Sequence, residues 1–247
     1  MNEILCRQLA LDYCCSPEEI LGGGSVFTEY RPLEGRRRFR EGEECFLKVA
    51  AVNGRLLFTG KAEIVEKCRE RWGNSGSEWF FEARELRALD TLLRAEGRQI
   101  AMLHPFFIAE TPSEVRADGI DVRWYRGEEI EAFRGDGRFG EAFSFCPEAP
   151  DVLGVAALQD GAIVGMAGAS ADSPTMWQIG INVAPGQEGA GIGTMLVRLL
   201  KNEILRQGVL PFYGTATSHI ASQRVALAAG FVPAWAELVA EKCGAES

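Results

Sequence analysis

The stretch of sequence that decides the fold runs from residue 177 to residue 194 and reads WQIGINVAPGQEGAGIGT. It begins as an apolar strand, passes through a turn with glycines at positions 189, 191 and 193, and continues into a helix. A strand, a glycine-rich turn and a helix in this order predict an α/β fold with a ligand at the turn. The helix has one apolar face, because apolar residues recur at steps of three and four: Ile192, Met195, Leu196, Leu199, Leu200 and Ile204.

The glycines of this turn favour the binding of an anion. The first turn of a helix has unpaired N–H groups and a partial positive charge. Gly189, Gly191 and Gly193 allow these amides to approach a phosphate without an intervening Cβ. A glycine within a helix costs up to about 1 kcal/mol relative to alanine, and a turn without a ligand has little reason to carry that cost. We therefore expect a pyrophosphate at this turn.

Two common nucleotide-binding motifs do not fit the stretch. A P-loop places Lys and then Ser or Thr after its last glycine, whereas Ile192 and Gly193 stand there. A dinucleotide fingerprint that starts at Gly189 needs glycine at the position of Thr194. It also needs an acidic residue at the end of the next strand, and the sequence there, YGTAT at 213–217, has none. A dinucleotide-dependent oxidoreductase is thus disfavoured.

The stretch resembles the acyl-CoA-binding signature of the GNAT superfamily of N-acyltransferases. The usual family pattern is Arg or Gln, two residues, Gly, one residue, and Gly or Ala, and here Glu188 opens the run EGAGIG. Residues 218–231, SHIASQRVALAAGF, resemble the Asn-x-x-Ser…Gly-Phe helix of the family. The resemblance covers residues 121 to 242, about the second half of the chain.

The resemblance implies where acetyl-CoA binds. The strand from 177 to 183 would splay from the next strand, and its backbone near Ile181 and Val183 would pair with the pantetheine arm and stabilise the oxyanion. His219 and Ser222, at the start of the last helix, would contribute to the cofactor site. The pyrophosphate would lie on the turn, whose residues are Glu188, Gly189, Ala190, Gly191, Ile192, Gly193 and Thr194.

The implied function is transfer of an acetyl group from acetyl-CoA to an amine, without a metal. Three positions depart from the family: Glu188 replaces Arg or Gln, His219 replaces a common Asn, and Ala226 replaces a Tyr that protonates the departing thiolate in many relatives. These departures leave a non-catalytic acyl-CoA-binding or sensor module as the alternative. The acceptor amine is not identified by the sequence.

No single residue stands out as the catalytic acid or base. The central strand carries Gln178 and Asn182, neither of which can act as a base near neutral pH, where many relatives place a Glu. The base would be a residue elsewhere, such as Glu237 or Asp172, or an ordered water, and the sequence does not choose among them. Tyr213 is a candidate for the acid.

His219 is a further catalytic candidate. We expect Thr217 or Ser218 to cap the helix that follows, since hydroxyls accept hydrogen bonds from the free amides of a first turn. His219 would then lie beside those amides as a neutral imidazole that positions the cofactor or a water.

The remaining patterns complete a mixed α/β fold. Hairpins are predicted at 46–59, around Asn53 and Gly54, and at 154–169, around Asp160 and Gly161. Helices are predicted at 62–72 and 77–96, a strand at 99–108, and a final strand at 235–241. Residues 110–119 lack any periodicity. We therefore predict a smaller α+β domain of unknown role at 1–115, followed at 120–247 by a GNAT-like acyltransferase domain with a mixed sheet flanked by helices.

The composition limits which classes of partner and which cellular compartment we expect for the protein. The net charge of −9, from 26 basic and 35 acidic residues, argues against a nucleic-acid partner. No apolar run approaches the roughly 18–20 residues of a membrane span, and the N-terminus does not read as a signal peptide. Seven cysteines without a CxxC pair and two histidines give no zinc-ligand spacing. We expect a cytoplasmic protein that binds acetyl-CoA and an amine; its oligomeric state is not indicated.

Overall fold

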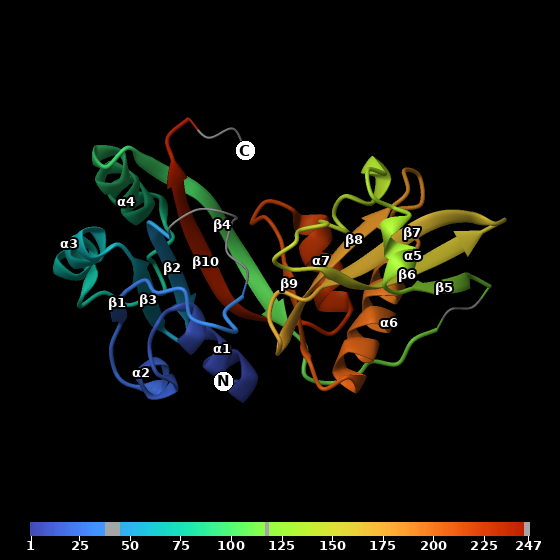
Figure 1. Ribbon diagram of the computed structural model, residues 1–247, viewed down its shortest axis with the longest axis horizontal. Helices are drawn as coiled ribbons and strands as arrows, with labels where there is room; N and C mark the ends of the chain where they lie inside the picture. The colour runs from blue at the N-terminus through green and yellow to red at the C-terminus, as the bar shows by residue number, and fades with distance from the viewer. Residues whose placement is uncertain (38–44, 117–118, 245–247) are drawn as a thin grey trace. The chain divides into compact units, whose positions relative to one another are not determined.

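The computed structural model describes residues 1–37, 45–116 and 119–244. They divide into two compact units: unit 1 comprises Met1–Phe106 and Ala234–Ser247, and unit 2 comprises Phe107–Pro233. This partition differs from the predicted domains at 1–115 and 120–247. The final strand groups with the N-terminal elements (Figure 1) because it pairs antiparallel with a strand of unit 1, Ala236 lying opposite Ala51. Residues 117 and 118 of the predicted boundary lie outside the described ranges.

Unit 1 consists of part of a mixed sheet and four helices. Its strands follow the order β1-β3-β2-β10-β4. The β1–β3 pair is parallel, whereas β2 is antiparallel to both β3 and β10. The elements are α1 (Glu3–Asp12), α2 (Pro17–Leu21), β1 (Val26–Glu29), β2 (Leu47–Val52), β3 (Arg55–Gly60), α3 (Ala62–Trp72), α4 (Ala83–Ala95), β4 (Arg98–Ile108) and β10 (Val232–Lys242).

Local turn chemistry accounts for the first hairpin, and tertiary packing accounts for a shifted helix. Asn53 and Gly54 have φ values of 49° and 78°, as the tight turn between β2 and β3 requires. The helix expected at 77–96 begins only at Ala83. Before it, the Phe80 ring packs edge-on against Trp72 at a centroid distance of 5.4 Å. Burial of this ring favours a turn over a further helical turn.

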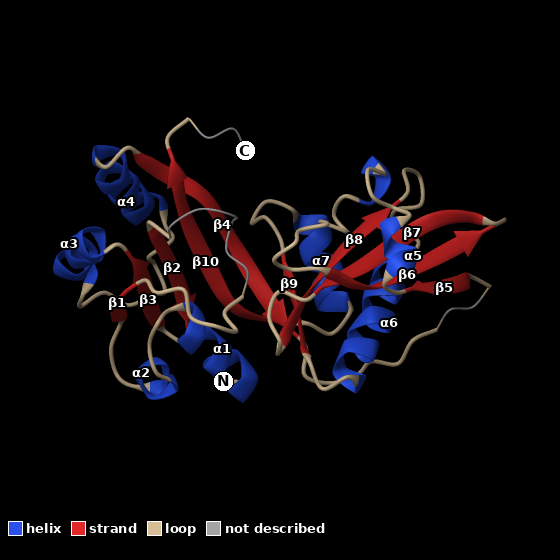
Figure 2. Ribbon diagram, viewed as in Figure 1, coloured by secondary structure: helices blue, strands red, loops and turns tan. Residues whose placement is uncertain are grey.

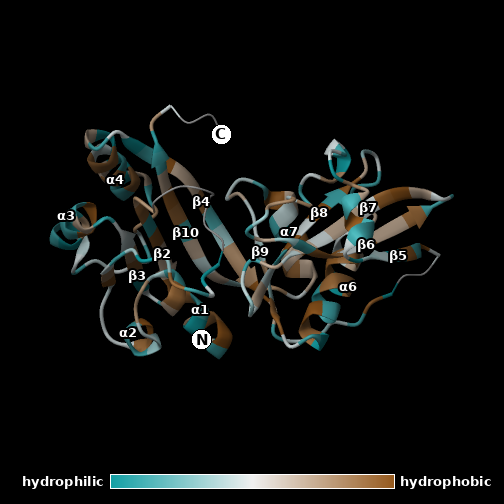
Figure 3. Ribbon diagram, viewed as in Figure 1, coloured by the Kyte–Doolittle hydropathy of each residue, from teal (hydrophilic) through white to brown (hydrophobic). Residues whose placement is uncertain are grey.

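Unit 2 is a mixed sheet with helices on it, as predicted (Figure 2). Its strand order is β9-β8-β7-β6-β5, with β8 and β9 parallel and the other pairs antiparallel. Figure 3 shows apolar segments along β6 and β7. The elements are β5 (Asp121–Tyr125), α5 (Glu128–Glu131), the 3₁₀ helix η1 (Gly137–Phe139), β6 (Asp151–Gln159), β7 (Ala162–Ser170), β8 (Met176–Val183), α6 (Ile192–Arg206), β9 (Leu210–Gly214) and α7 (Ile220–Ala228).

Both faces of the unit 2 sheet are covered. On one face the apolar side of α6, including Leu196 and Leu200, packs on strand residues such as Val155. On the other face Phe139 and Phe143 belong to a second apolar cluster, which is built from η1, the chain that follows it and the strands beneath. The strands β6, β7 and β8 therefore form a buried platform between α6 and the segment 139–145.

Candidate functional site

The turn before α6 is made of left-handed glycines. Gly186, Gly189 and Gly191 have φ values of 83°, 81° and 82°, a region that other residues rarely adopt. Gly191 is the N-cap residue of α6, which begins at Ile192, and it makes no side-chain capping hydrogen bond. The amides of the first helical turn are therefore not used by a side-chain cap, and the pyrophosphate site at this turn stays a prediction.

Gly193 has a different purpose from its neighbours. It is buried within α6, and a Cβ built on it would lie 3.3 Å from Cγ2 of Val183 and 3.7 Å from Val225. A contact of 3.3 Å is tighter than side chains commonly make, so glycine lets α6 approach β8 closely. Gly193 thus contributes close helix–strand packing, which the expected phosphate contact does not explain.

Glu188 folds back onto the turn that contains it. Its Oε2 accepts a hydrogen bond of 2.7 Å from the backbone N–H of Gly186. The carboxylate is exposed, and it is held at the start of the turn by the turn's own backbone. Its negative charge is therefore partly compensated by the backbone of the turn itself.

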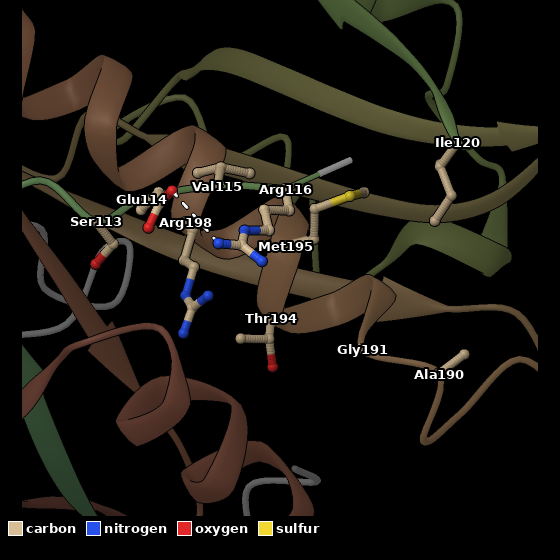
Figure 4. A pocket seen from close by; sticks show the side chains of 10 residues that line it. All are labelled: Ser113, Glu114, Val115, Arg116, Ile120, Ala190, Gly191, Thr194, Met195 and Arg198. Atoms are coloured by element: carbon tan, nitrogen blue, oxygen red, sulfur yellow. Dashed lines mark ion pairs between the residues drawn. The ribbon is translucent and has the colours of Figure 1, made fainter. Parts of the chain in front are cut away.

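A pocket of about 720 Å³ opens beside the start of α6 (Figure 4). Gly191, Thr194 and Arg198 line it from the turn and the helix, and residues 113–116 line it from the chain that precedes β5. The Arg198 guanidinium is fixed by hydrogen bonds of 2.6 and 3.2 Å to the carbonyl oxygen of Ala228 at the end of α7. The pocket combines open helix amides with a held cation, which suits an anionic ligand.

Strand β8 separates from β9 partway along its length, as predicted. The paired residues run from Met176 opposite Leu210 to Gln178 opposite Phe212. On its other edge β8 stays paired with β7 as far as Val183. The part of β8 beyond Gln178 therefore has an edge that the register with β9 does not reach, and Ile181 and Val183 lie in it.

The structure brings together two predicted site residues, Tyr213 and Ser222. The Tyr213 Oη lies 2.9 Å from the Ser222 Oγ, joining the end of β9 to α7. The ring is buried and packs against Phe231 at a centroid distance of 6.0 Å. Burial raises the pKa of Tyr213, the Ser222 hydrogen bond lowers it in part, and the charge of Glu141 raises it further. The phenol is therefore held in its protonated, neutral form.

The predicted cap of α7 is wrong. The N-cap residue is His219, in place of Thr217 or Ser218, and His219 makes no side-chain capping hydrogen bond. The turn is instead closed by its backbone, since the N–H of Ile220 donates to the Ser218 carbonyl at 3.0 Å. His219 is exposed at this turn.

The two carboxylates considered as bases are both buried and bonded. Glu237 belongs to unit 1, where its Oε2 lies 2.9 Å from the Arg37 Nη2 and accepts a 2.9 Å hydrogen bond from the Tyr13 hydroxyl. Asp172 lies between β7 and β8 and accepts a hydrogen bond of 2.6 Å from the Ser170 hydroxyl. Each carboxylate is therefore held by hydrogen bonds to neighbouring side chains.

A row of three glycines crosses the platform, and sequence reasoning missed it. Gly154, Gly168 and Gly180 lie opposite one another on β6, β7 and β8. A Cβ on Gly168 would lie 2.0 Å from the carbonyl oxygen of Ala142, and one on Gly180 would lie 1.7 Å from that of Glu141. Only glycine leaves room for this backbone, so the segment at 141–142 rests directly on the sheet. The signal in the sequence was glycine within each of three strands, two of them in β7.

Asn182 fixes the same segment from below. Its Oδ1 accepts hydrogen bonds from the backbone N–H groups of Glu141, at 3.0 Å, and Ala142, at 2.8 Å. A second anchor lies further along, where Asp151 accepts a bond of 2.7 Å from the N–H of Phe145. The amide on β8 thus has a defined purpose: it holds Glu141 above Gly180.

The described residues contain neither a cluster suited to a metal ion nor a helix suited to a membrane. Within residues 1–37, 45–116 and 119–244, no group of three or more His, Cys, Asp or Glu side chains could hold a metal ion. None of the helices found there is both long enough and apolar enough to cross a membrane.

Several solved structures are similar to this chain, whereas no curated protein matches it. A GCN5-related N-acetyltransferase from Kribbella flavida is 18% identical, with a TM-score of 0.47 over 62% of this chain and 63% of its own. A GCN5-related N-acetyltransferase-like protein from Streptococcus suis is 13% identical, with a TM-score of 0.48 over 85% and 89% of the two chains. A GNAT-family acetyltransferase structure from Novosphingobium aromaticivorans is 16% identical, with a TM-score of 0.43 over 59% and 68%.

The family comparison falls on the elements described above. Residues 121–231 match the model of the acetyltransferase (GNAT) family. The match starts with β5, ends at Phe231, and lies entirely within unit 2. It includes the glycine turn, the separated part of β8 and Tyr213. Residues 121–231 therefore form a GNAT-family acetyltransferase domain.

Proposed function

We propose that the protein is an N-acyltransferase that moves an acetyl group from acetyl-CoA to an amine. One observation carries the proposal: the family match contains both an uncapped helix start behind left-handed glycines and a strand that separates from its parallel neighbour. The first feature suits a pyrophosphate, and the second suits an extended arm that pairs with backbone. Acetyl-CoA has both parts.

In this proposal the cofactor lies along unit 2 from α6 to β8. The pyrophosphate binds the amides at Gly191, Ile192 and Gly193, with the remaining nucleotide toward the pocket that Thr194 and Arg198 line. The pantetheine arm pairs with the free edge of β8 near Ile181 and Val183, and backbone N–H groups there stabilise the oxyanion. His219 and Ser222, at the start of α7, border the same site.

The chemistry moves two protons. An ammonium loses one proton, and the nitrogen lone pair then forms the C–N bond while the C–S bond of the thioester breaks. The departing thiolate takes the second proton of the nitrogen, either directly or through an acid that gives its own proton to sulfur and recovers the one from nitrogen, leaving an amide and CoA. A thiol has an ordinary pKa of about 8.5, so an acid helps less than it would for an alkoxide, and holding the two substrates together supplies much of the rate.

Tyr213 is the residue we assign as the proton donor to the thiolate. Ala226, at the position where many GNAT relatives carry a tyrosine, is fully buried and has no hydroxyl. The Tyr213 phenol comes instead from β9, lies in the apolar cluster on the α6 side, and is oriented by Ser222. Its neutral form is the one that an acid requires.

The experiment combines calorimetry with an assay of CoA release. We expect acetyl-CoA to bind and CoA to be released only when an amine is added. Binding without release, across primary amines of varied charge and size, would favour the sensor module. Absence of binding would reject both functions.

A further inference from the structure

Glu141 is held where β8 leaves β9. Its backbone carbonyl lies on Gly180, and its N–H is bonded to Asn182, two residues along the same strand. Both positions follow Gln178, the last residue of β8 in the register with β9. A contact between residues 41 positions apart fixes this placement, together with a glycine that no other residue can replace without moving the segment.

Glu141 and Tyr213 lie on opposite faces of the sheet at this separation. Ile181 and Val183 of β8 contact Gly193, so they face α6, whereas Gly180 and Asn182 face the segment that carries Glu141. Tyr213 belongs to the apolar cluster on the α6 face.

The charge of Glu141 nevertheless acts on the Tyr213 hydroxyl. Burial is the main reason why the pKa of Tyr213 is raised, and the Glu141 carboxylate adds to it. The backbone of Glu141, which lies on Gly180, and Tyr213, which follows Phe212, are both placed where the register of β8 with β9 ends. A thioester placed at that edge would have a carboxylate on one side and a phenol on the other.

The Glu141 carboxylate is also available to a substrate. It is exposed, and within the described parts of the chain it has no ion-pair partner. Glu237 and Asp172 differ in this respect, because both are buried and hydrogen-bonded. An exposed, unpaired carboxylate fixed by its own backbone is suited to a cation that arrives from solution.

We infer that Glu141 binds the ammonium group of a cationic primary amine and takes its first proton. The inference rests on the proposed function and names its substrate class. In the step, one proton passes from nitrogen to the Glu141 carboxylate, the C–N bond forms as the C–S bond breaks, and a second proton reaches the thiolate through Tyr213. The carboxyl group then releases its proton to water, which restores the carboxylate.

The test compares Glu141→Gln with Glu128→Gln. Gln keeps the size of the side chain and removes its charge, and Glu128 is an exposed acid on α5, which packs on β6. The probes are acetyl-CoA with spermidine, kanamycin or an N-acetylated lysine amide. For the best of these amines we expect Glu141→Gln to lower kcat/KM by about 100-fold, because positioned acid–base groups contribute about that much. The Kd for acetyl-CoA should stay within about twofold of the parent value, and Glu128→Gln should behave as the parent.

Two results would overturn the inference while leaving the proposed function intact. One is a Glu141→Gln variant with the parent's kcat/KM for the cationic amines. The other is a parent protein that binds acetyl-CoA and acetylates none of the three cationic probes. A parent protein that does not bind acetyl-CoA would instead refute the proposed function, and the inference with it.

Discussion

One glutamate in each unit has opposite surroundings: Glu237 of unit 1 is buried, whereas Glu141 of unit 2 is exposed. In unit 1, the Arg37 side chain is 7% exposed and lies between two carboxylates, 2.5 Å from the Asp12 Oδ2 and 2.9 Å from the Glu237 Oε2. The guanidinium also lies over the Trp235 ring, 4.9 Å from its centroid. In unit 2, the Glu141 carboxylate is exposed and has no ion-pair partner among the described residues, although its backbone is fixed.

This difference shows that the surroundings of a glutamate determine whether it contributes to stability or is available to a ligand. Removing one partner of a buried ion pair leaves an uncompensated charge, so Glu237 and Arg37 depend on each other for the stability of unit 1. An exposed carboxylate carries no such constraint and contributes little to stability. The comparison therefore predicts that removing the charge of Arg37 affects the stability of unit 1. Removing the charge of Glu141 should instead affect binding or rate.

The largest expected effect in unit 2 is on cofactor binding. Gly191→Asp should abolish CoA binding, because a carboxylate would face the pyrophosphate at the helix start. A Cβ at this position meets no atom within 4 Å, so the side chain itself fits. Gly191→Asn is the matched control, since Asn has the same shape, no charge and a similar tolerance of positive φ. Calorimetry should show weakened binding for Asn and none for Asp; equal affinities for parent and Asp would contradict the phosphate site.

In unit 1 the largest effect is on folding. Arg37→Met should lower the free energy of unfolding by about 3–5 kcal/mol, because two buried carboxylates lose their cation. The control is Arg7→Met, which breaks an exposed pair with Glu3 and should change the free energy by less than about 0.5 kcal/mol. Urea unfolding measures both. Similar values for the two variants would show that the buried pair does not stabilise unit 1.

Lowering the pH should weaken the buried cluster of Arg37, Asp12 and Glu237. Burial by itself raises the pKa of Asp12, but the charges of Arg37 and Lys48 and the hydrogen bonds from Arg37 outweigh it, so the folded pKa lies below the ordinary value of 3.8. A lowered carboxyl pKa gives stability that is present above the unfolded pKa and is lost as pH falls through the folded one. The urea concentration at the unfolding midpoint should therefore decrease as the pH is lowered below about 4. Arg37→Met should flatten this dependence, and an unchanged profile in that variant would contradict the assignment.

A smaller effect, on kcat, is expected when the Tyr213 hydroxyl is removed. Tyr213→Phe should lower kcat by about tenfold, less than a typical acid, because a thiolate leaves readily. The Kd for acetyl-CoA should not change. Ser222→Ala keeps the phenol and removes only its 2.9 Å partner, so it should have a milder effect on kcat. Parent-like turnover in Tyr213→Phe would make this tyrosine purely structural.

The smallest effect is expected at His219. The side chain is exposed at the start of α7 and makes no capping bond, so His219→Asn should retain the parent's turnover. His219→Ala should raise the KM for acetyl-CoA by about two- to threefold if the imidazole donates one hydrogen bond to the cofactor. Steady-state kinetics distinguishes the pair, and identical KM values in Ala, Asn and parent would remove His219 from the site.

Much of the fold could be predicted because local chemistry determines it. Asn53 with Gly54 and Asp160 with Gly161 take the positive φ values that their hairpins need. Ser16 caps α2 with a reciprocal bond to Glu19, a contact between residues three positions apart. The glycine turn before α6 follows the same logic, since its residues are neighbours in the chain.

The rest depends on contacts that are distant in sequence. Glu237 was a plausible base until its bond to Arg37, 200 residues away, placed it in a buried pair. No local pattern singles out Glu141, because its position is fixed by Gly180 and Asn182 on a strand about 40 residues later. Hydrophobic periodicity predicts that such strands exist, but it does not say which loop lies on their glycines.

The measurement that tests the central claim most directly is transfer of a labelled acetyl group. The protein is incubated with acetyl-CoA deuterated in its acetyl group and with a cationic primary amine, and the amine is analysed by mass spectrometry. We predict an amine heavier by one deuterated acetyl group, formed by the parent protein and lost in Gly191→Asp. Bound acetyl-CoA with no labelled product, across both cationic and neutral primary amines, would contradict the account.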